Sequence, residues 1–315
     1  MNYFRFVLNK KSYKLTFREK SGGRDEELLS MGSDDDWILN AMSGDDTKLK
    51  EKLSAEIWND TAAKEEYNYP MSEGKYTELI INGSYEGLYM LQRKVEPKFL
   101  GLDGEYLFKG YAPPGTDIYS CESFEMVSPL YSGQEKHRIC REIFDEGIFE
   151  RIDPRNLADV NIFLAFASAC DNAQRKNMFY IVNTETDTPY TTLVPWDTDW
   201  SYGMSWNGGL EYNKEYMLSV MPERMETDKM CEIYPELDRL TAGRWFELRK
   251  NELSLDSVLS RIEAHGNALD NSGALIRDRQ KWGLSFGGED SREAMCGFIA
   301  QRLEILDRYY SDFLS

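Results

Sequence analysis

The sequence predicts an α+β fold in which a small, strand-rich lobe precedes a larger, mainly helical one. Two observations predict this division. Residues 1–98 combine alternating apolar and polar runs with one amphipathic helix and a hairpin, whereas residues 99–315 carry most of the helical periodicity. No internal repeat or low-complexity linker separates the two parts, so we expect abutting lobes of a single unit.

The first 98 residues contain signals for strands, a helix and a hairpin. The runs FRFVL and YKLTF, between positions 4 and 17, alternate apolar and polar residues as half-buried strands do. The stretch DDTKLKEKLSAEIWND is typical of a helix that Asp45 or Asp46 can cap, and Glu56 falls on its apolar stripe. Residues 77–95 form the clearest hairpin, because Asn82-Gly83 supplies the turn.

In residues 99–315, apolar residues recur mainly at helical spacing and seldom alternate with polar ones as in strands. Helices are predicted over 135–151, 156–170, 234–251, 254–271 and 291–313. The exception lies between the second and third of them, where the strands MFYIV and YTTLVPW are joined by a polar turn. The chain therefore places a short β-pair inside a helical lobe.

The charge balance limits the classes of partner. The formal net charge is −18, and a chain this acidic repels phosphate backbones and anionic lipids. We therefore expect no nucleic-acid partner. No apolar run is long enough to span a bilayer, and the first residues, MNYFRFVLNKKSYKL, are too short and too charged for a signal peptide.

Cysteine and histidine usage argues against two further kinds of site. The five cysteines are spaced irregularly and form no CxxC pair, so neither a zinc site nor a dense disulfide framework is predicted. Only two histidines are present, which disfavours a histidine metal cluster or a histidine base. Carboxylates are therefore the better candidates for chemistry.

Those carboxylates occur in one stretch, between Asp171 and Gly203. Asp171 follows a predicted helix, Asn177 precedes a strand, and Asp197 and Asp199 come at the end of the next strand, in PWDTDWSYG. Phosphoryl transfer needs a carboxylate beside the attacking hydroxyl and oxygen ligands that hold magnesium, and kinases place them in this order. The Asp171–Asn177 spacing alone is also ordinary turn chemistry. The alternative for Asp197 and Asp199 is that they only cap backbone amides.

Several blocks of the chain, in order, resemble the spore coat protein H (CotH) kinase family. The blocks are KKSYKLTFRE (10–19), WILNAMSGDDTKLKEKLSAEIW (37–58), YTELIINGSYEGLYMLQRKV (76–95), YLFKG (106–110) and VPWDTDWSYG (194–203). The resemblance covers nearly the whole chain, and its most specific parts are the hairpin and the WDTDW block. It implies an atypical, secretory-type kinase fold with two lobes. It also implies phosphorylation of protein serines with ATP and a divalent cation, Mg²⁺ or Mn²⁺.

The resemblance assigns roles to the carboxylates and to the lysines. Asp171 would orient and deprotonate a serine hydroxyl, while Asn177 and Asp197 hold the metal and Asp199 serves as a further ligand. A kinase also needs a strand lysine on the phosphates, held by a helix glutamate. Lys14 and Glu56 are the predicted pair, because Lys14 alternates with apolar neighbours on a strand. Lys11 is its close competitor, and Lys109 in YLFKG is a third candidate for the phosphates.

Two other functions are compatible with the same fold. A pseudokinase or surface-binding module would keep the fold and act by contact alone, and a nucleotidyl transferase would use ATP for a different transfer. Two departures from the family bear on this choice. The glycine-containing turn that usually precedes the KKSYKL block is absent, and Gln92-Arg93-Lys94 stands where many members carry an acidic residue. The family resemblance points to a spore coat or cell-surface location.

Overall fold

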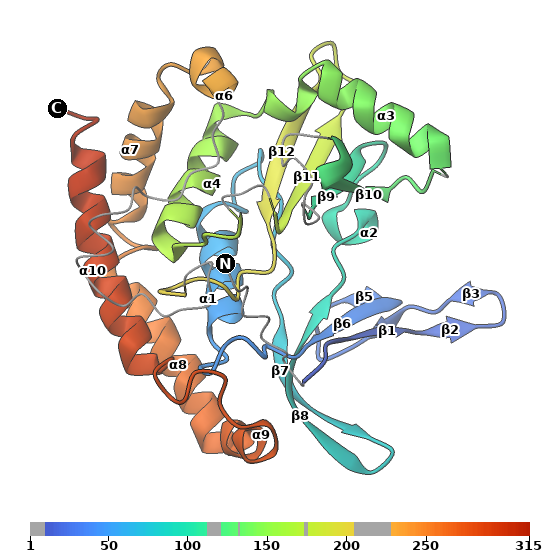
Figure 1. The fold of residues 1–315 in the computed structure, drawn as a ribbon, viewed down its shortest axis with the longest axis vertical. Helices are drawn as coiled ribbons and strands as arrows, with labels where there is room; N and C mark the ends of the chain where they lie inside the picture. Colours follow the sequence, from blue (N-terminus) through green and yellow to red (C-terminus); the bar gives the residue numbers. More distant parts are fainter. Residues whose placement is uncertain (1–9, 112–120, 132, 173–175, 205–227) are drawn as a thin grey trace, which may run out of the picture.

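The computed structural model describes residues 10–111, 121–131, 133–172, 176–204 and 228–315 (Figure 1). Helices and strands are both abundant, which confirms the predicted α+β class. The predicted strand FRFVL lies outside the described residues. Two four-stranded antiparallel sheets and a group of helices make up most of the described chain.

The first sheet has the strand order β1-β6-β8-β7. Its strands are β1 (Tyr13–Thr16), β6 (Asp36–Asn40), β8 (Ser84–Arg93) and β7 (Lys75–Ile81). The predicted hairpin is confirmed, since β7 and β8 are joined by Asn82 and Gly83, both in the left-handed region with φ of 51° and 82°. Two short strand pairs, β2–β3 (Arg18–Glu19 and Gly22–Gly23) and β4–β5 (Glu26–Glu27 and Ser33–Asp34), extend from this sheet.

Helix α1 (Lys50–Thr61) confirms the predicted helix and shows which aspartate caps it. The Asp45 carboxylate accepts hydrogen bonds from the Thr47 amide, at 2.8 Å, and from the Lys50 amide, at 2.9 Å. The Asp46 carboxylate instead accepts hydrogen bonds from the backbone amides of Ser285 and Phe286, near the C-terminal end of the chain. Asp45 therefore satisfies one of the free amides at the start of α1, that of Lys50.

The second sheet has the strand order β10-β9-β11-β12. Its strands are β10 (Phe124–Ser128), β9 (Tyr106–Gly110), β11 (Met178–Asn183) and β12 (Tyr190–Pro195), and α2 (Pro97–Leu100) and η1 (Cys121–Ser123) lead into β9 and β10. In this sheet Met178 is paired with Gly110 on one side and with Pro195 on the other. The end of β9, the start of β11 and the end of β12 therefore meet at one edge.

The five predicted helical segments are confirmed, with shifted ends. They are α3 (Gly133–Asp145), α4 (Pro154–Ala167), α7 (Leu237–Leu248), α8 (Leu255–Ser272) and α10 (Arg292–Ser311), and α7, α8 and α10 line the side of the molecule opposite β2 and β3 (Figure 1). η2 (Ile148–Glu150) lies at the end of the predicted segment 135–151, whereas the helices α6 (Asp228–Ile233) and α9 (Ala274–Trp282) were not predicted. Helix α9 packs on β8, where Asp278 accepts the Leu88 amide at 2.8 Å.

The main hydrophobic core includes residues from both sides of position 98. Leu53, Ile57 and Trp58 of α1 belong to the same buried cluster as Phe163 of α4 and Phe298 of α10. A smaller cluster of Trp37, Leu39, Ala41, Tyr89 and Leu91 lies within the first sheet. Helix α1, which precedes position 98, therefore shares one buried core with helices α4 and α10, which follow it. Over the described residues, no helix combines the length and the apolar character needed to cross a membrane.

Candidate active site

One edge of the second sheet brings together residues that are far apart in the sequence. The Asn177 amide donates to the Gly110 carbonyl at 3.0 Å, and the Trp196 amide donates to the Asn177 carbonyl at 2.9 Å. These bonds extend the pairing of β9, β11 and β12 by one residue at this edge. Lys109, Asn177 and Asp197 therefore lie at neighbouring strand ends.

The structure places Asp171 beside Asn177, as the predicted catalytic loop requires. The Asn177 side-chain amide donates to Asp171 Oδ2 at 3.1 Å, and the Lys176 ammonium lies 3.3 Å from Asp171 Oδ1. The buried Asn172 side chain donates to the Asn177 and Trp196 carbonyls, each at 2.8 Å. Asn172 is thus hydrogen-bonded to the backbone just before β11 and just after β12.

Asp197 and Asp199 lie in strongly negative surroundings. Burial raises the pKa of Asp197, the Lys109 ammonium opposes this shift, and the Asp171 charge adds to it. Burial also raises the pKa of Asp199 well above its usual range, and the charges of Asp197 and Glu51 raise it further. The negative charge here is only partly compensated.

Glu51, which is not among the predicted site residues, holds the segment between these two aspartates. Its Oε2 accepts hydrogen bonds from the amide and the hydroxyl of Thr198, each at 2.8 Å. The side chain is buried, and burial together with the Asp197 charge raises its pKa. No sequence pattern marked Glu51, because it lies off the apolar stripe by which the helix was recognised.

The loop before α1 packs directly on Asp199. A Cβ built on Gly44 would lie 3.1 Å from Asp199 Oδ2 and 3.8 Å from Trp200 Nε1. Such a contact is tighter than side chains ordinarily make, so a residue larger than glycine would push against the carboxylate. Gly44 therefore permits the close approach of this loop to the acidic site.

The comparison with protein families adds independent information. A family model described as CotH kinase protein matches residues 2–306. The chain belongs to the CotH kinase family. No curated protein matches it significantly. Family membership confirms the resemblance and indicates a kinase-like function.

The structure does not bring the predicted pair of Lys14 and Glu56 together. Lys14 lies half-exposed on β1, with its ammonium 2.6 Å from Asp36 Oδ2. Glu56 interacts with His265, at 2.8 Å, and with Lys52, at 3.2 Å. Burial acts to raise the pKa of Glu56, but the His265 hydrogen bond and the Lys52 charge outweigh it, so the pKa is lowered. The glutamate of α1 that faces the acidic site is Glu51, one and a half turns earlier.

The other two candidate lysines differ in their relation to the site. Lys11 is exposed at the start of the described chain. Lys109 is partly buried on β9, its ammonium lies 5.8 Å from the centre of the Trp196 ring, and its charge acts on Asp197. Of the three predicted lysines, Lys109 is the one whose charge reaches the carboxylates.

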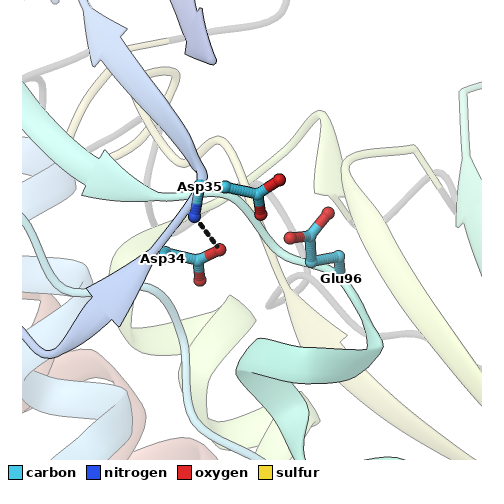
Figure 2. Close-up of side chains that lie close together, drawn as sticks. All are labelled: Asp34, Asp35 and Glu96. Atoms are coloured by element: carbon cyan, nitrogen blue, oxygen red, sulfur yellow. Dashed lines mark hydrogen bonds between the residues drawn. The ribbon is translucent and has the colours of Figure 1, made fainter. Parts of the chain in front are cut away.

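A second acidic cluster lies outside this site. Oxygen atoms of Asp34, Asp35 and Glu96 all lie within 4.8 Å of one another, and Figure 2 shows the three side chains converging. Basic side chains already compensate this charge: the Arg93 guanidinium lies 2.8 Å from Asp34, and the Lys94 ammonium lies 3.0 Å from Glu96. We therefore interpret this cluster as part of an ion-pair network that holds β5 to the end of β8.

Proposed function

We propose that this CotH kinase is an ATP- and Mg²⁺-dependent protein kinase that transfers the γ-phosphoryl group to a serine hydroxyl of a protein substrate. The observation that supports the proposal is the convergence of Asp171, Asn177, Asp197 and Lys109 on one sheet edge, with Asp199 next to them. A two-lobed arrangement with its boundary near residue 98 is part of this proposal.

The carboxylates suit a divalent cation. Mg²⁺ and Mn²⁺ prefer oxygen ligands. Burial first, and then the neighbouring carboxylate charges, raise the pKa values of Asp197 and Asp199, and a bound cation would favour their charged forms. We assign Asn177 and Asp197 as ligands and Asp199 as a further ligand. When bound, the metal would neutralise the negative charge that develops on the phosphates as the γ-phosphoryl group is transferred.

Asp171 would act on the acceptor. Its carboxylate orients the serine hydroxyl and accepts its proton as the serine oxygen bonds to the γ-phosphorus. The bond from that phosphorus to the β–γ bridging oxygen breaks, and ADP leaves. The hydrogen bond from Asn177 and the ion pair with Lys176 keep the carboxylate in one orientation. Such preorganisation is what in-line transfer requires.

Lys109 is our candidate for contact with the nucleotide phosphates. Its position on β9 is fixed by pairing with Phe179 of β11 and Glu125 of β10. The ammonium acts on Asp197 across the site, so a phosphate held by the same metal would lie within its reach. Lys14, in contrast, is engaged by Asp36.

The proposal is tested by offering ATP that carries the radiolabel in either the α- or the γ-position, with a serine-rich acceptor peptide. We expect transfer of the γ-label alone, and loss of transfer in Asp171→Ala while the Mg²⁺-dependent rise in melting temperature with nucleotide persists. Asp187→Ala is the matched control, because Asp187 is exposed in the β11–β12 turn. Transfer of the α-label would favour a nucleotidyl transferase. Nucleotide binding without any transfer would favour a pseudokinase.

A further inference from the structure

Two cysteines that are 19 residues apart in the sequence lie side by side where η1 packs on α3. The Cys140 thiol donates to the Cys121 carbonyl oxygen at a distance of 3.3 Å. Cys140 is buried, with 4% of its surface exposed, and Cys121 is partly exposed. The fold thus creates a pair that the irregular cysteine spacing did not reveal.

The different environments of the two thiols give them different reactivity. Burial raises the pKa of Cys140 to about 12, and the neighbouring Cys121 adds to the shift while Lys136 opposes it. The thiolate is the nucleophile in exchange reactions, so Cys140 is protected from external reagents by both its burial and its protonation. Cys121 is the thiol that a reagent in solution meets first.

We propose that Cys121 and Cys140 form a thiol–disulfide exchange site, which closes to an intramolecular disulfide on reaction with a small-molecule disulfide such as oxidised glutathione. The Cys121 thiolate attacks one glutathione sulfur, forming a mixed disulfide and releasing one glutathione thiolate. The Cys140 thiol then loses its proton, attacks the Cys121 sulfur and releases the second glutathione. Two protein thiols are oxidised, and one glutathione disulfide is reduced to two thiols.

The disulfide would connect parts of the fold that lead to the candidate active site. Cys121 begins η1, which runs directly into β10. β10 pairs with β9, so that Glu125 lies opposite Lys109. Closing the disulfide would therefore anchor the outer strand of the second sheet to α3. The proposal does not depend on the proposed function, because it concerns thiol chemistry alone.

The test uses the full chain in reduced and oxidised glutathione at pH 8, followed by alkylation and a non-reducing peptide map. We expect a linked Cys121–Cys140 peptide in the wild type and in the control Cys296→Ser, which alters a cysteine in α10. Cys140→Ser should instead keep a glutathione adduct on Cys121. The closed disulfide should raise the melting temperature of the wild type by about 5 °C, because it removes conformational freedom from the unfolded chain.

Two results would overturn the proposal. One is alkylation of both Cys121 and Cys140 when the oxidised wild-type protein is unfolded without reductant and then alkylated. The other is a glutathione adduct on Cys121 of the wild type that persists without giving the linked peptide. If Cys140→Ser does not fold, Cys121→Ser replaces it, and the linked peptide must then be absent while Cys140 stays alkylatable after unfolding.

Discussion

Glu51 accepts two hydrogen bonds from Thr198, one from its amide and one from its hydroxyl, each at 2.8 Å. Thr198 lies between Asp197 and Asp199, so the first turn of α1 fixes the backbone that carries both carboxylates. Both Glu51 and Thr198 are buried, and hydrogen bonds in such surroundings are costly to leave unmade. Glu51 thereby connects the region around the first sheet to the acidic site.

Substitution of Glu51 should separate hydrogen bonding from charge. Glu51→Ala leaves the Thr198 amide and hydroxyl without their partner, and we expect a loss of about 2–3 kcal/mol in the free energy of unfolding. Glu51→Gln retains an acceptor oxygen and removes a buried charge, so its loss should be smaller. Chemical denaturation of the metal-free protein measures both. Equal losses in the two variants would show that the charge, and not the hydrogen bonds, stabilises this segment.

Asp199→Asn should stabilise the metal-free protein at neutral and alkaline pH. The folded state raises the pKa of Asp199 above its unfolded value of 3.8, so ionisation of this group costs folding free energy. That cost is absent below the unfolded pKa and grows as the pH rises through the folded-state pKa. The variant should therefore melt above the wild type at pH 8 and at nearly the same temperature at pH 3.5. Melting curves in EDTA decide this, and a constant difference across the pH range would contradict it.

Lys109→Met should weaken the binding of Mg²⁺–ATP by roughly tenfold to a hundredfold, the usual effect of losing a charge-assisted contact. Lys14→Met serves as the matched control, because it removes a half-exposed lysine that pairs with Asp36. Its affinity for Mg²⁺–ATP should remain near that of the wild type. Isothermal titration calorimetry compares the three proteins. A larger effect of Lys14→Met would indicate that Lys14 on β1, and not Lys109, contacts the phosphates.

Gly44→Ala should disturb the acidic site without a large loss of stability. The new methyl group would lie 3.1 Å from Asp199 Oδ2, so either the loop or the carboxylate must shift. We expect a smaller Mg²⁺-dependent rise in melting temperature with ATP. Gly243→Ala is the control, since a Cβ at this position of α7 meets no atom within 4 Å and alanine favours a helix by about 1 kcal/mol. An unchanged metal response in Gly44→Ala would show that the loop yields without moving Asp199.

Part of the candidate site was predictable from the order of residues along the chain. Asp171 and Asn177 flank a short loop, and two adjacent antiparallel strands bring the end of the second back to the start of the first. The proximity of Asp197 to Asn177 therefore follows from the hairpin, which the sequence shows. The hydrogen bond from Asn177 to Asp171 was not predicted, although the two residues are only six positions apart.

The partners of the lysines and glutamates were not predictable in this way. The helical period correctly placed Glu56 on a face that packs against other elements, but period does not say which element a face meets, and that face meets His265 of α8. Glu51 and Thr198 are joined across 147 positions, and Cys121 and Cys140 across 19. The sequence by itself determined the local elements, because backbone preference and apolar spacing act over a few residues. Only the tertiary structure decided which charges and thiols became neighbours, because that depends on how whole helices and sheets pack.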